Sequence, residues 1–153
     1  MSYNLDLSPT QASITAKLET ITSLPTLPDG IPDEESDRIP KDAAGNVTPF
    51  LIVWFRTLHV APHGAAFGGP RMDSYLSGFD VMCVAADGTT SRTTLNMVAD
   101  GLIGWKPTNA GHVTKIRSLY EGSRAVLDST SRPSRFASTD RYQFSPFAQR
   151  STP

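Results

Sequence analysis

Cysteine is the scarcest chemically reactive residue in this chain, since Cys83 is the only one among 153 residues. A lone cysteine excludes a framework of intramolecular disulfides. Because Cys83 lies within the apolar stretch FDVMCVAA, we expect a buried, inert thiol rather than a nucleophile.

Long apolar runs are missing too. No stretch reaches the roughly 20 apolar residues that a membrane-spanning helix needs, and no secretory signal is recognisable at the start of the chain. We therefore expect no membrane partner, and a location in the cytoplasm or in something assembled there.

Net charge is nearly absent. The formal value of −1 argues against a general nucleic-acid-binding protein. The charges are unevenly spread, however: residues 1–87 hold five Lys/Arg and eleven Asp/Glu, whereas residues 88–153 hold nine and four. Such a bipolar chain can attract copies of itself, although two solvated faces explain the same distribution equally well.

Catalytic and cofactor-binding motifs are also lacking. No phosphate-binding loop, His-Glu-x-x-His zinc site, Cys-x-x-Cys pair or Gly-x-Ser-x-Gly elbow occurs. The glycines of FGGPR (67–71) precede no convincing helix, and the spacing of His59, His63 and His112 does not make their rings converge on a metal. The sequence therefore predicts no enzyme, no cofactor and no metal site.

The pattern that is present predicts an α+β fold in one domain spanning residues 1–153. We expect a single mixed or antiparallel β-sheet with two helices packed on one face. Ser8-Pro9-Thr10-Gln11 reads as a capping box that opens the first helix, and Pro25 ends that helix. The second helix is expected to start near Thr89 or Ser91, to carry an apolar stripe, and to close before Pro107.

Strands and loops follow from the same kind of pattern. FLIVWFRTLHV (50–60) is apolar on both faces through Phe55, as in a covered central strand, and FDVMCVAAD (79–87) is expected to be its returning partner. Two further extended segments are predicted at 112–122 and 135–147. Residues 25–49, with five prolines, and residues 61–78 are expected to be long polar loops.

Two glycines in ADGLIGWKP (99–107) call for an explanation, because glycine inside a helix costs roughly 0.5–1 kcal/mol. We expect Gly101 to let the helix approach the strands closely. Gly104 suits the position just after the helix, where a positive φ is useful, and Trp105 is expected to cover the end of the core.

The candidate binding residues are charged and lie mostly in the expected loops. The simplest interpretation of the acidic run at 33–37 is a solvent-exposed loop. The arginines near Pro133 are also expected to be exposed, because the residues around them are polar. The acidic run serves solubility or faces a partner protein. The densest basic set is Arg124, Arg132, Arg135 and Arg141, and the partner expected for it, if it binds one, is a nucleic-acid backbone or the acidic loop of a neighbouring copy. The candidate interface residues are Asp33, Glu34, Glu35, Asp37, Arg71, Arg132 and Arg135.

The chain resembles the tail terminator proteins of long-tailed bacteriophages. The resemblance covers most of residues 5–147 and rests on LPDGIPD…DAAGNVTPFLIVWF, on FDVMCVAADGTTSRTTLNMVADGLIGWKP and on RPSRFASTDRYQF. Its most telling parts are DGLIGWKP with the preceding strand, and the closing RF…DRYQF. The segment 61–78 is longer than in the simplest members of that family.

The resemblance implies a structural virion protein without catalytic residues. Members form a hexameric ring that caps the finished tail tube and then joins the tail to the head through the neck. The implied partners are further copies of the chain, the tail tube protein, a head-closure protein and, at the long loop, the tape measure protein. Genomic DNA would pass through the lumen without sequence-specific binding. A head-closure or tail-completion protein is the neighbouring alternative, and a small ligand-binding domain or enzyme is the alternative from another class.

Overall fold

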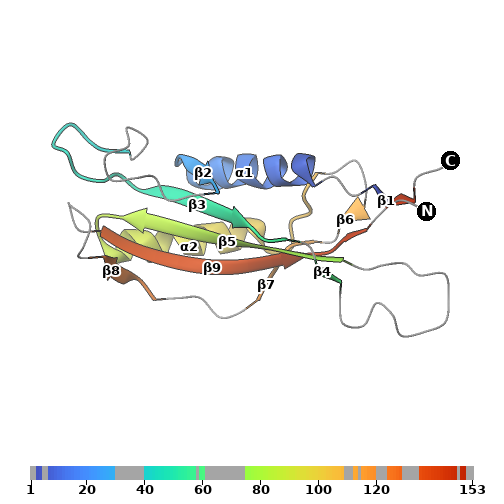
Figure 1. The fold of residues 1–153 in the computed structure, drawn as a ribbon. Helices are drawn as coiled ribbons and strands as arrows, with labels where there is room; N and C mark the ends of the chain where they lie inside the picture. The colour runs from blue at the N-terminus through green and yellow to red at the C-terminus, as the bar shows by residue number, and fades with distance from the viewer. Residues whose placement is uncertain are drawn as a thin grey trace.

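A mixed β-sheet with both helices on one side forms the body of the molecule (Figure 1). The computed structural model describes residues 3–4, 7–29, 40–57, 59–60, 75–108, 112–113, 115–119, 124–128, 135–147 and 149–150. The two helices in these segments are α1 (Ser8–Thr22) and α2 (Gly88–Leu102). The strands of the main sheet are β2 (Thr26–Pro28), β3 (Phe50–Phe55), β4 (His59–Val60), β5 (Tyr75–Ala85), β7 (Arg117–Ser118), β8 (Val126–Asp128) and β9 (Arg135–Phe144).

The order of the main sheet is β2-β3-β5-β9-β7, with β4 beside β5 and β8 beside β9. β2 runs parallel to β3, and the other neighbours are antiparallel. Two short pairs lie outside this sheet: β1 (Tyr3–Asn4) with β11 (Gln149–Arg150), and β6 (His112–Val113) with β10 (Pro146–Phe147). The predicted α+β class with a mixed sheet is confirmed.

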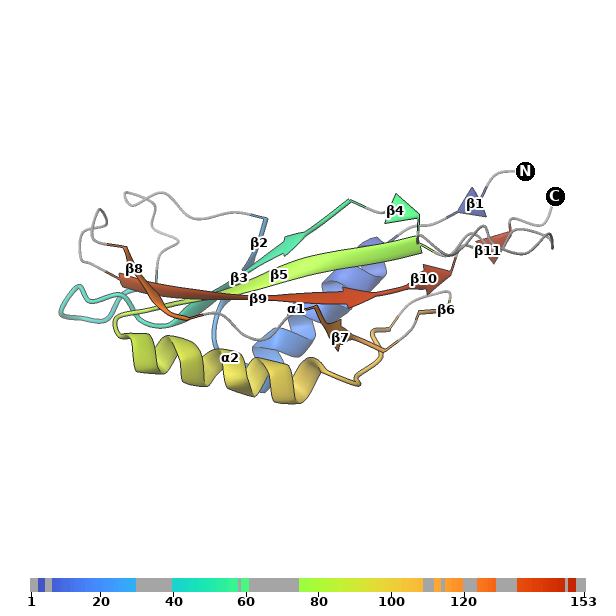
Figure 2. The same ribbon diagram turned by 90° about the horizontal axis from the view of Figure 1, so that it is seen from below.

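Both helices pack on the same face of the sheet, which we call the first face (Figure 2). Ile14 and Leu18 of α1 share one buried cluster with the α2 stripe of Leu95, Val98 and Leu102. The sheet contributes alternate residues to this cluster, since successive side chains of a strand point to opposite faces. These residues are Leu51 and Val53 of β3, Phe79, Val81 and Cys83 of β5, and Tyr142 and Phe144 of β9.

The start of α2 was predicted closely. Asp87 is the N-cap residue, and its carboxylate accepts hydrogen bonds from the backbone N–H and the hydroxyl of Thr90, both at 2.7 Å. The acceptor satisfies a backbone donor that has no partner within the helix. In the buried layer between α2 and the sheet, the Ser91 hydroxyl bonds to Ser138 of β9 at 2.9 Å.

The predicted capping box of α1 is wrong. The helix begins one position earlier than expected, so that Leu7 is its N-cap and the Gln11 N–H bonds to the Leu7 carbonyl at 2.9 Å. An apolar N-cap side chain has no acceptor to offer, and no side-chain bond caps this end. Pro9, which lacks an N–H, sits in the first turn, where it removes one of the donors that would need a partner.

Both predicted loops are shorter than expected. Residues 26–28 form β2 in parallel register with β3 although Pro25 precedes them and Pro28 ends them, and Thr26 is buried. Residues 75–78 belong to β5, which reaches beyond the Phe79 start that was predicted. The rest of these two loops, 30–39 and 61–74, lies outside the described residues. The turn at 42–46 is present, and the Asp42 carboxylate accepts from the Ala44 and Asn46 N–H groups at 2.9 Å.

Gly101, inside α2, and Gly104, just after its end, have different roles. A Cβ on Gly101 would lie 2.5 Å from Cδ1 of Ile21, so the close approach is to α1 and the expectation that Gly101 faces the strands is wrong. Gly104 follows the helix with φ +82°, as expected. Its N–H bonds to the Ile116 carbonyl at 2.9 Å, and Trp105 packs against the core cluster as predicted.

Candidate interaction surface

The face of the main sheet opposite the two helices carries both apolar and charged side chains, and we call it the second face. Three cross-strand rows from β3, β5 and β9 build it, as the register of the strands dictates. The rows are Phe50–Val84–Ala137, Ile52–Met82–Thr139 and Trp54–Asp80–Arg141.

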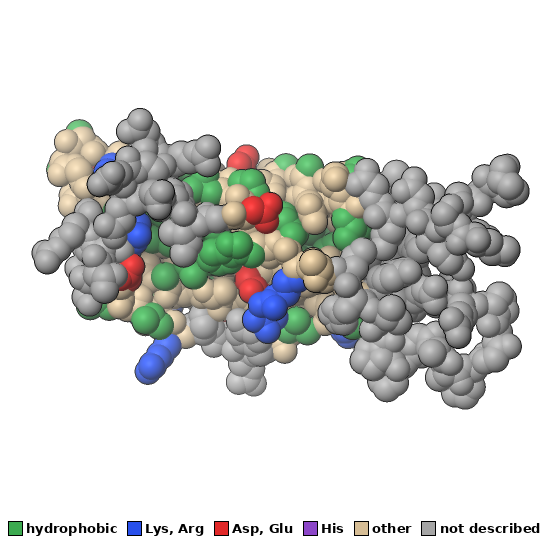
Figure 3. All heavy atoms as spheres, viewed as in Figure 1, with side chains coloured by type: hydrophobic (Ala, Val, Ile, Leu, Met, Phe, Trp, Pro, Cys, Tyr) green, Lys and Arg blue, Asp and Glu red, His purple; other side chains and the backbone are tan. Residues whose placement is uncertain are grey.

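The first two rows of the second face are largely apolar. Phe50 and Ile52 are 0% exposed and cluster with Val47 and Val84. Leu27, Trp54, Met82 and Ala137 surround them and are only partly buried. Figure 3 shows apolar side chains gathered on the molecule in the view of Figure 1, next to acidic and basic ones. Because Phe50 and Ile52 are fully buried within the chain, only the partly buried members of this cluster are open to another surface.

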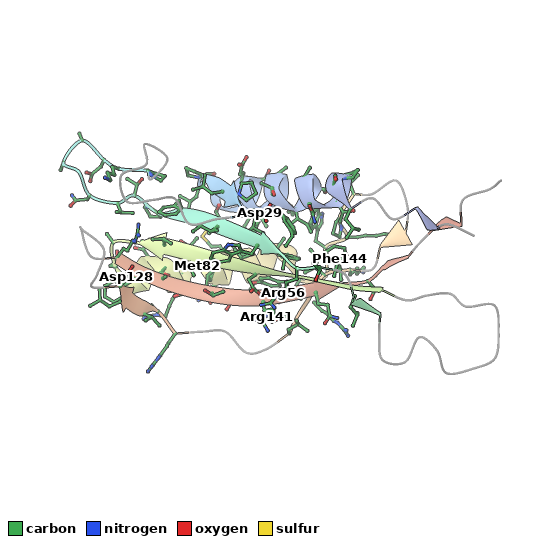
Figure 4. All side chains as sticks on the ribbon, viewed as in Figure 1. Asp29, Arg56, Met82, Asp128, Arg141 and Phe144 are labelled. Carbon is green, nitrogen blue, oxygen red and sulfur yellow. The ribbon has the colours of Figure 1, made fainter. Side chains whose placement is uncertain are left out.

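The third row contains a cluster of three charges that we call the Arg–Asp–Arg triad: Arg56, Asp80 and Arg141. Nη2 of Arg56 donates to Oδ2 of Asp80 at 2.6 Å, and Nε of Arg141 donates to Oδ1 of the same carboxylate at 2.9 Å. Figure 4 shows the side chains of Arg56 and Arg141 close together near the middle of the sheet. The triad thus joins the end of β3 to β5 and β9.

Local backbone geometry places the triad. The Arg56 N–H bonds to the Gly78 carbonyl at 2.9 Å, which continues the β3–β5 ladder by one residue. The stem of Arg56 then passes over Gly78, where a Cβ would lie 3.3 Å from its Cδ. Arg141 is the register partner of Asp80 on β9, so its side chain starts on the same face.

The exposure of the triad decides what it can do. The Asp80 side chain is 15% exposed, whereas those of Arg56 and Arg141 are 46% and 38% exposed. A carboxylate so far removed from water needs its cationic partners, and two guanidinium groups supply them. The guanidinium groups themselves still reach the solvent.

Arg117 extends the basic character of this part of the second face. It lies on β7 opposite Gln143, which is two residues beyond Arg141 on β9, and it is exposed. Paired residues of neighbouring strands point to the same face, so Arg117 shares the face of the triad.

Of the interface residues predicted from sequence, Arg135 alone falls within the described residues. Its expected exposure is wrong, because it is 9% exposed and its side chain lies in the sheet at the start of β9. Nε of Arg135 lies 3.9 Å from Oδ2 of Asp128, its register partner on β8. Asp33, Glu34, Glu35, Asp37, Arg71 and Arg132 lie outside the described residues, so their role at an interface stays a prediction.

Sequence reasoning missed two members of the triad, Arg56 and Asp80. Arg141 was one of the basic residues near the end of the chain, but nothing in the local pattern pairs it with a residue 61 positions earlier. A usable signal was present: both Asp80 and Arg56 interrupt or end strands that are otherwise apolar. A charge in such a strand requires a partner, and only the register identifies it.

Cys83 is buried, as the sequence predicts for an unreactive thiol. Burial raises the pKa of the Cys83 thiol to about 11, whereas hydrogen bonds with Thr94 and Ser91 act in the opposite direction. At neutral pH the nucleophilic thiolate is therefore scarce. The described residues contain no group of His, Cys, Asp or Glu that would hold a metal ion. Within those residues, no helix is long and apolar enough to cross a membrane.

Among known proteins, the chain has a similar structure but no matching sequence family. No protein-family model and no curated protein matches the sequence. The structure is similar to a chain from the virion of a native gene transfer agent (GTA) particle, with a TM-score of 0.52. The likeness is one of fold. The two sequences are 15% identical, and the match covers 91% of this chain and 94% of that chain.

Proposed function

We propose that this chain is a structural virion protein, and specifically a tail terminator that forms a hexameric ring, caps the tail tube and joins the tail to the neck of the head. The observation that carries the proposal is the fold shared with a chain of a GTA virion over nearly the full length of both. The sequence resemblance to tail terminators, which spans most of residues 5–147, makes the proposal more specific.

The proposed role requires surfaces rather than an active site. A ring subunit contacts two neighbouring copies, the tail tube protein on one side and a head-closure protein on the other. The tape measure protein is a further candidate partner, at the loop predicted over residues 61–78. The partly buried apolar side chains of the second face, Leu27, Trp54 and Met82, together with the part-exposed arginines beside them, supply a surface of the kind that such contacts need. Genomic DNA would pass through the lumen without sequence-specific contacts, and we propose no catalytic step and no cofactor.

Fractionation of virus particles tests this proposal. The culture that produces the protein is lysed, particles are banded on a density gradient, and every fraction is probed for the chain. We expect it to migrate with intact tailed particles at a low and constant copy number, and labelled microscopy should place it at the joint between head and tail. Recovery in the soluble fraction alone would contradict a virion role and return attention to a ligand-binding domain.

Microscopy also separates the proposal from its nearest alternative. A tail terminator remains attached to the end of tails that have not yet joined a head, whereas a head-closure protein remains on filled heads without tails. Label on the isolated heads would therefore replace the proposed role with head closure or tail completion.

A further inference from the structure

We propose that β8 pairs antiparallel with β8 of a second copy of the chain, about a two-fold axis that passes beside Val126. The contact joins the main sheets of the two copies into one continuous sheet. Because a two-fold contact closes on itself, it cannot build a ring, so it is separate from the ring contacts of the proposed function and does not rest on them.

The hydrogen bonds of β9 show which way its backbone groups point. The Leu119 N–H, next to β7, bonds to the Arg141 carbonyl at 3.0 Å, so the backbone of Arg141 points away from β5 and toward the β7 side. Backbone N–H and C=O groups change sides at every residue of a regular strand, and β9 pairs with β5 in one unbroken register. The backbone groups of Ala137 and Arg135 therefore point to the same side as those of Arg141, where β8 lies.

Leu127 consequently presents its backbone to the outer side of β8. Val126 and Asp128 are the register partners of Ala137 and Arg135, so their N–H and C=O groups bond to β9, and those of Leu127 between them point away from it. In Figure 1, β8 lies beside β9 at the margin of the sheet. Among the described residues, no strand pairs with this outer side of β8.

The opposite edge of the sheet, β2, is protected against such pairing. The Asp29 N–H bonds to the Val53 carbonyl at 2.9 Å, so the backbone of its neighbour Pro28 faces away from β3. Proline has no N–H to offer a further strand, and its presence on an edge discourages pairing. Thr26, two positions earlier and on the same outward side, is only 6% exposed. β8 is thus the edge that offers a neighbouring strand both a donor and an acceptor.

The segment Arg124-Ala125-Val126-Leu127-Asp128 is complementary to itself when it pairs antiparallel with its centre at Val126. Ala125 and Leu127 of the two copies then form the hydrogen-bonded pairs, which matches the outward direction of the Leu127 backbone. The two Val126 side chains face each other in the closer, non-hydrogen-bonded arrangement. Arg124 of each copy lies opposite Asp128 of the other, so opposite charges meet at both ends of the contact.

Both charged groups are accessible to a second copy. Arg124 is exposed, and the side chain of Asp128 is 42% exposed, with Oδ2 at 3.9 Å from Nε of Arg135. An ionised carboxylate has about four lone-pair sites. Asp128 therefore keeps its contacts within the chain when a further guanidinium group approaches from the other copy.

Apolar side chains give the contact its driving force. Val126, at 57%, is the most exposed large apolar residue among those described, and Leu127 is 50% exposed. Val126 lies beside Ala137 and extends the row Phe50–Val84–Ala137 on the second face. Pairing about the two-fold axis continues this row into the same row of the second copy and removes the exposed surface of Val126 from water.

Cysteine cross-linking of the full chain tests the register. Val126→Cys, Leu127→Cys and the control Met97→Cys each introduce a thiol at an exposed apolar position, while the native Cys83 stays buried. Only position 126 lies opposite itself in the proposed pairing. Under mild oxidation, Val126→Cys should therefore form covalent dimers at least about tenfold faster than the other two variants, whose thiols are too far apart to be bridged directly. Non-reducing electrophoresis of timed samples measures the rates.

Sedimentation velocity of the reduced chain measures the strength of the contact. Val126→Lys places two like charges opposite each other across the axis, so it should dimerise at least about tenfold more weakly than the wild type. Met97→Lys makes the same change at a residue of α2 that is 46% exposed and should dimerise like the wild type. Circular dichroism of each variant verifies that a loss of association is not a loss of fold.

The inference is wrong if the wild-type chain stays monomeric at the highest concentration reached, or if Met97→Lys weakens association as much as Val126→Lys. Cross-linking at position 127 or 97 that is as fast as at position 126 would overturn the proposed register. Particle fractionation is read separately. A chain that enters virions but does not pair through β8 retains the proposed function and loses only this contact.

Discussion

At the scale of single residues, close packing determines what this chain tolerates. Gly101 shows this most clearly. Its position in α2 faces Ile21 of α1, and a Cβ there would lie 2.5 Å from Cδ1 and 2.7 Å from Cγ1 of that side chain. The loss of helix propensity at glycine is therefore compensated by contact between the two helices, which bury their apolar residues in one cluster.

Substitution of Gly101 should reveal this balance. Gly101→Ala is expected to lower the free energy of unfolding by about 1 kcal/mol, because displacing Ile21 outweighs the gain in helix propensity. In an Ile21→Ala background, the same change should instead raise it by up to about 1 kcal/mol. Urea denaturation of the four chains measures both effects. An identical effect of Gly101→Ala in the two backgrounds would show that contact with Ile21 is not the cause.

Cys83 illustrates how burial controls reactivity. Because the pKa of its thiol is raised to about 11, iodoacetamide should modify the folded chain at least about 100-fold more slowly than the unfolded chain at neutral pH. Mass spectrometry of timed samples measures the two rates. Comparable rates in native buffer and in denaturant would contradict a buried, protonated thiol.

At the scale of elements, the start of α2 depends on one side chain. Asp87 accepts two hydrogen bonds from Thr90, and the backbone N–H of Thr90 is the main reason that the pKa of Asp87 lies below its ordinary value. The carboxylate also lies at the positive end of the helix dipole. α1 lacks such a cap, so its stability depends more on the packing of Ile14 and Leu18.

The lowered pKa of Asp87 predicts a pH dependence. When the folded pKa lies below the unfolded one, the stabilisation is complete above the unfolded pKa and disappears as pH falls through the folded value. Asp87→Asn removes the proton equilibrium, so the variant should lose less stability than the wild type between about pH 6 and about pH 3. Urea midpoints across this range measure the difference.

Asp100→Asn is the matched control, since it removes an exposed carboxylate from the same helix without altering the cap. Asp42 also has a lowered pKa, chiefly through the Asn46 N–H, and its part of the acid sensitivity should persist in both variants. Equal acid sensitivity of wild type and Asp87→Asn would contradict the assignment of this effect to the cap.

At the scale of the whole molecule, the sheet separates two unlike surfaces. Its first face is covered by both helices, whereas its second face combines an apolar cluster with the Arg–Asp–Arg triad. Because the triad joins β3, β5 and β9, it also contributes to the cohesion of the sheet.

Removal of the central charge should separate these contributions. Asp80→Asn is expected to lower the free energy of unfolding by about 1–2 kcal/mol, because two arginines then face a neutral acceptor. The loss should shrink in about 1 M salt, which screens half-exposed guanidinium groups. Asp29→Asn, at an exposed carboxylate after β2, is the control. A variant as stable as the wild type at low salt would show that the triad contributes nothing to the fold.

Much of the fold was readable from local patterns. Apolar periodicity marked both helices and the strands that became β3, β5 and β9. The turn at 42–46 and the positive φ of Gly104 followed from residue chemistry. Local rules failed at Thr26–Pro28, where proline-rich sequence forms a parallel edge strand, and at Leu7, where the helix starts without a side-chain cap.

The candidate surface was less predictable, and the reason is sequence distance. Arg56 and Arg141 lie 24 and 61 positions from Asp80, and only the order and register of three strands bring them onto one carboxylate. Arg135 was expected to be exposed from its polar neighbours, yet its position at the start of β9 buries it beside Asp128.

The sequence by itself determined the α+β class, the helices and strands that make it up, the inert nature of Cys83 and the opposite charges of the two halves. These properties depend on periodicity and composition within short windows. Only the tertiary structure decided that Gly101 faces Ile21, that Arg135 is buried and that Asp80 joins two arginines on the second face. Each of these depends on which elements become neighbours, and that choice minimises the free energy of the whole chain rather than of any segment.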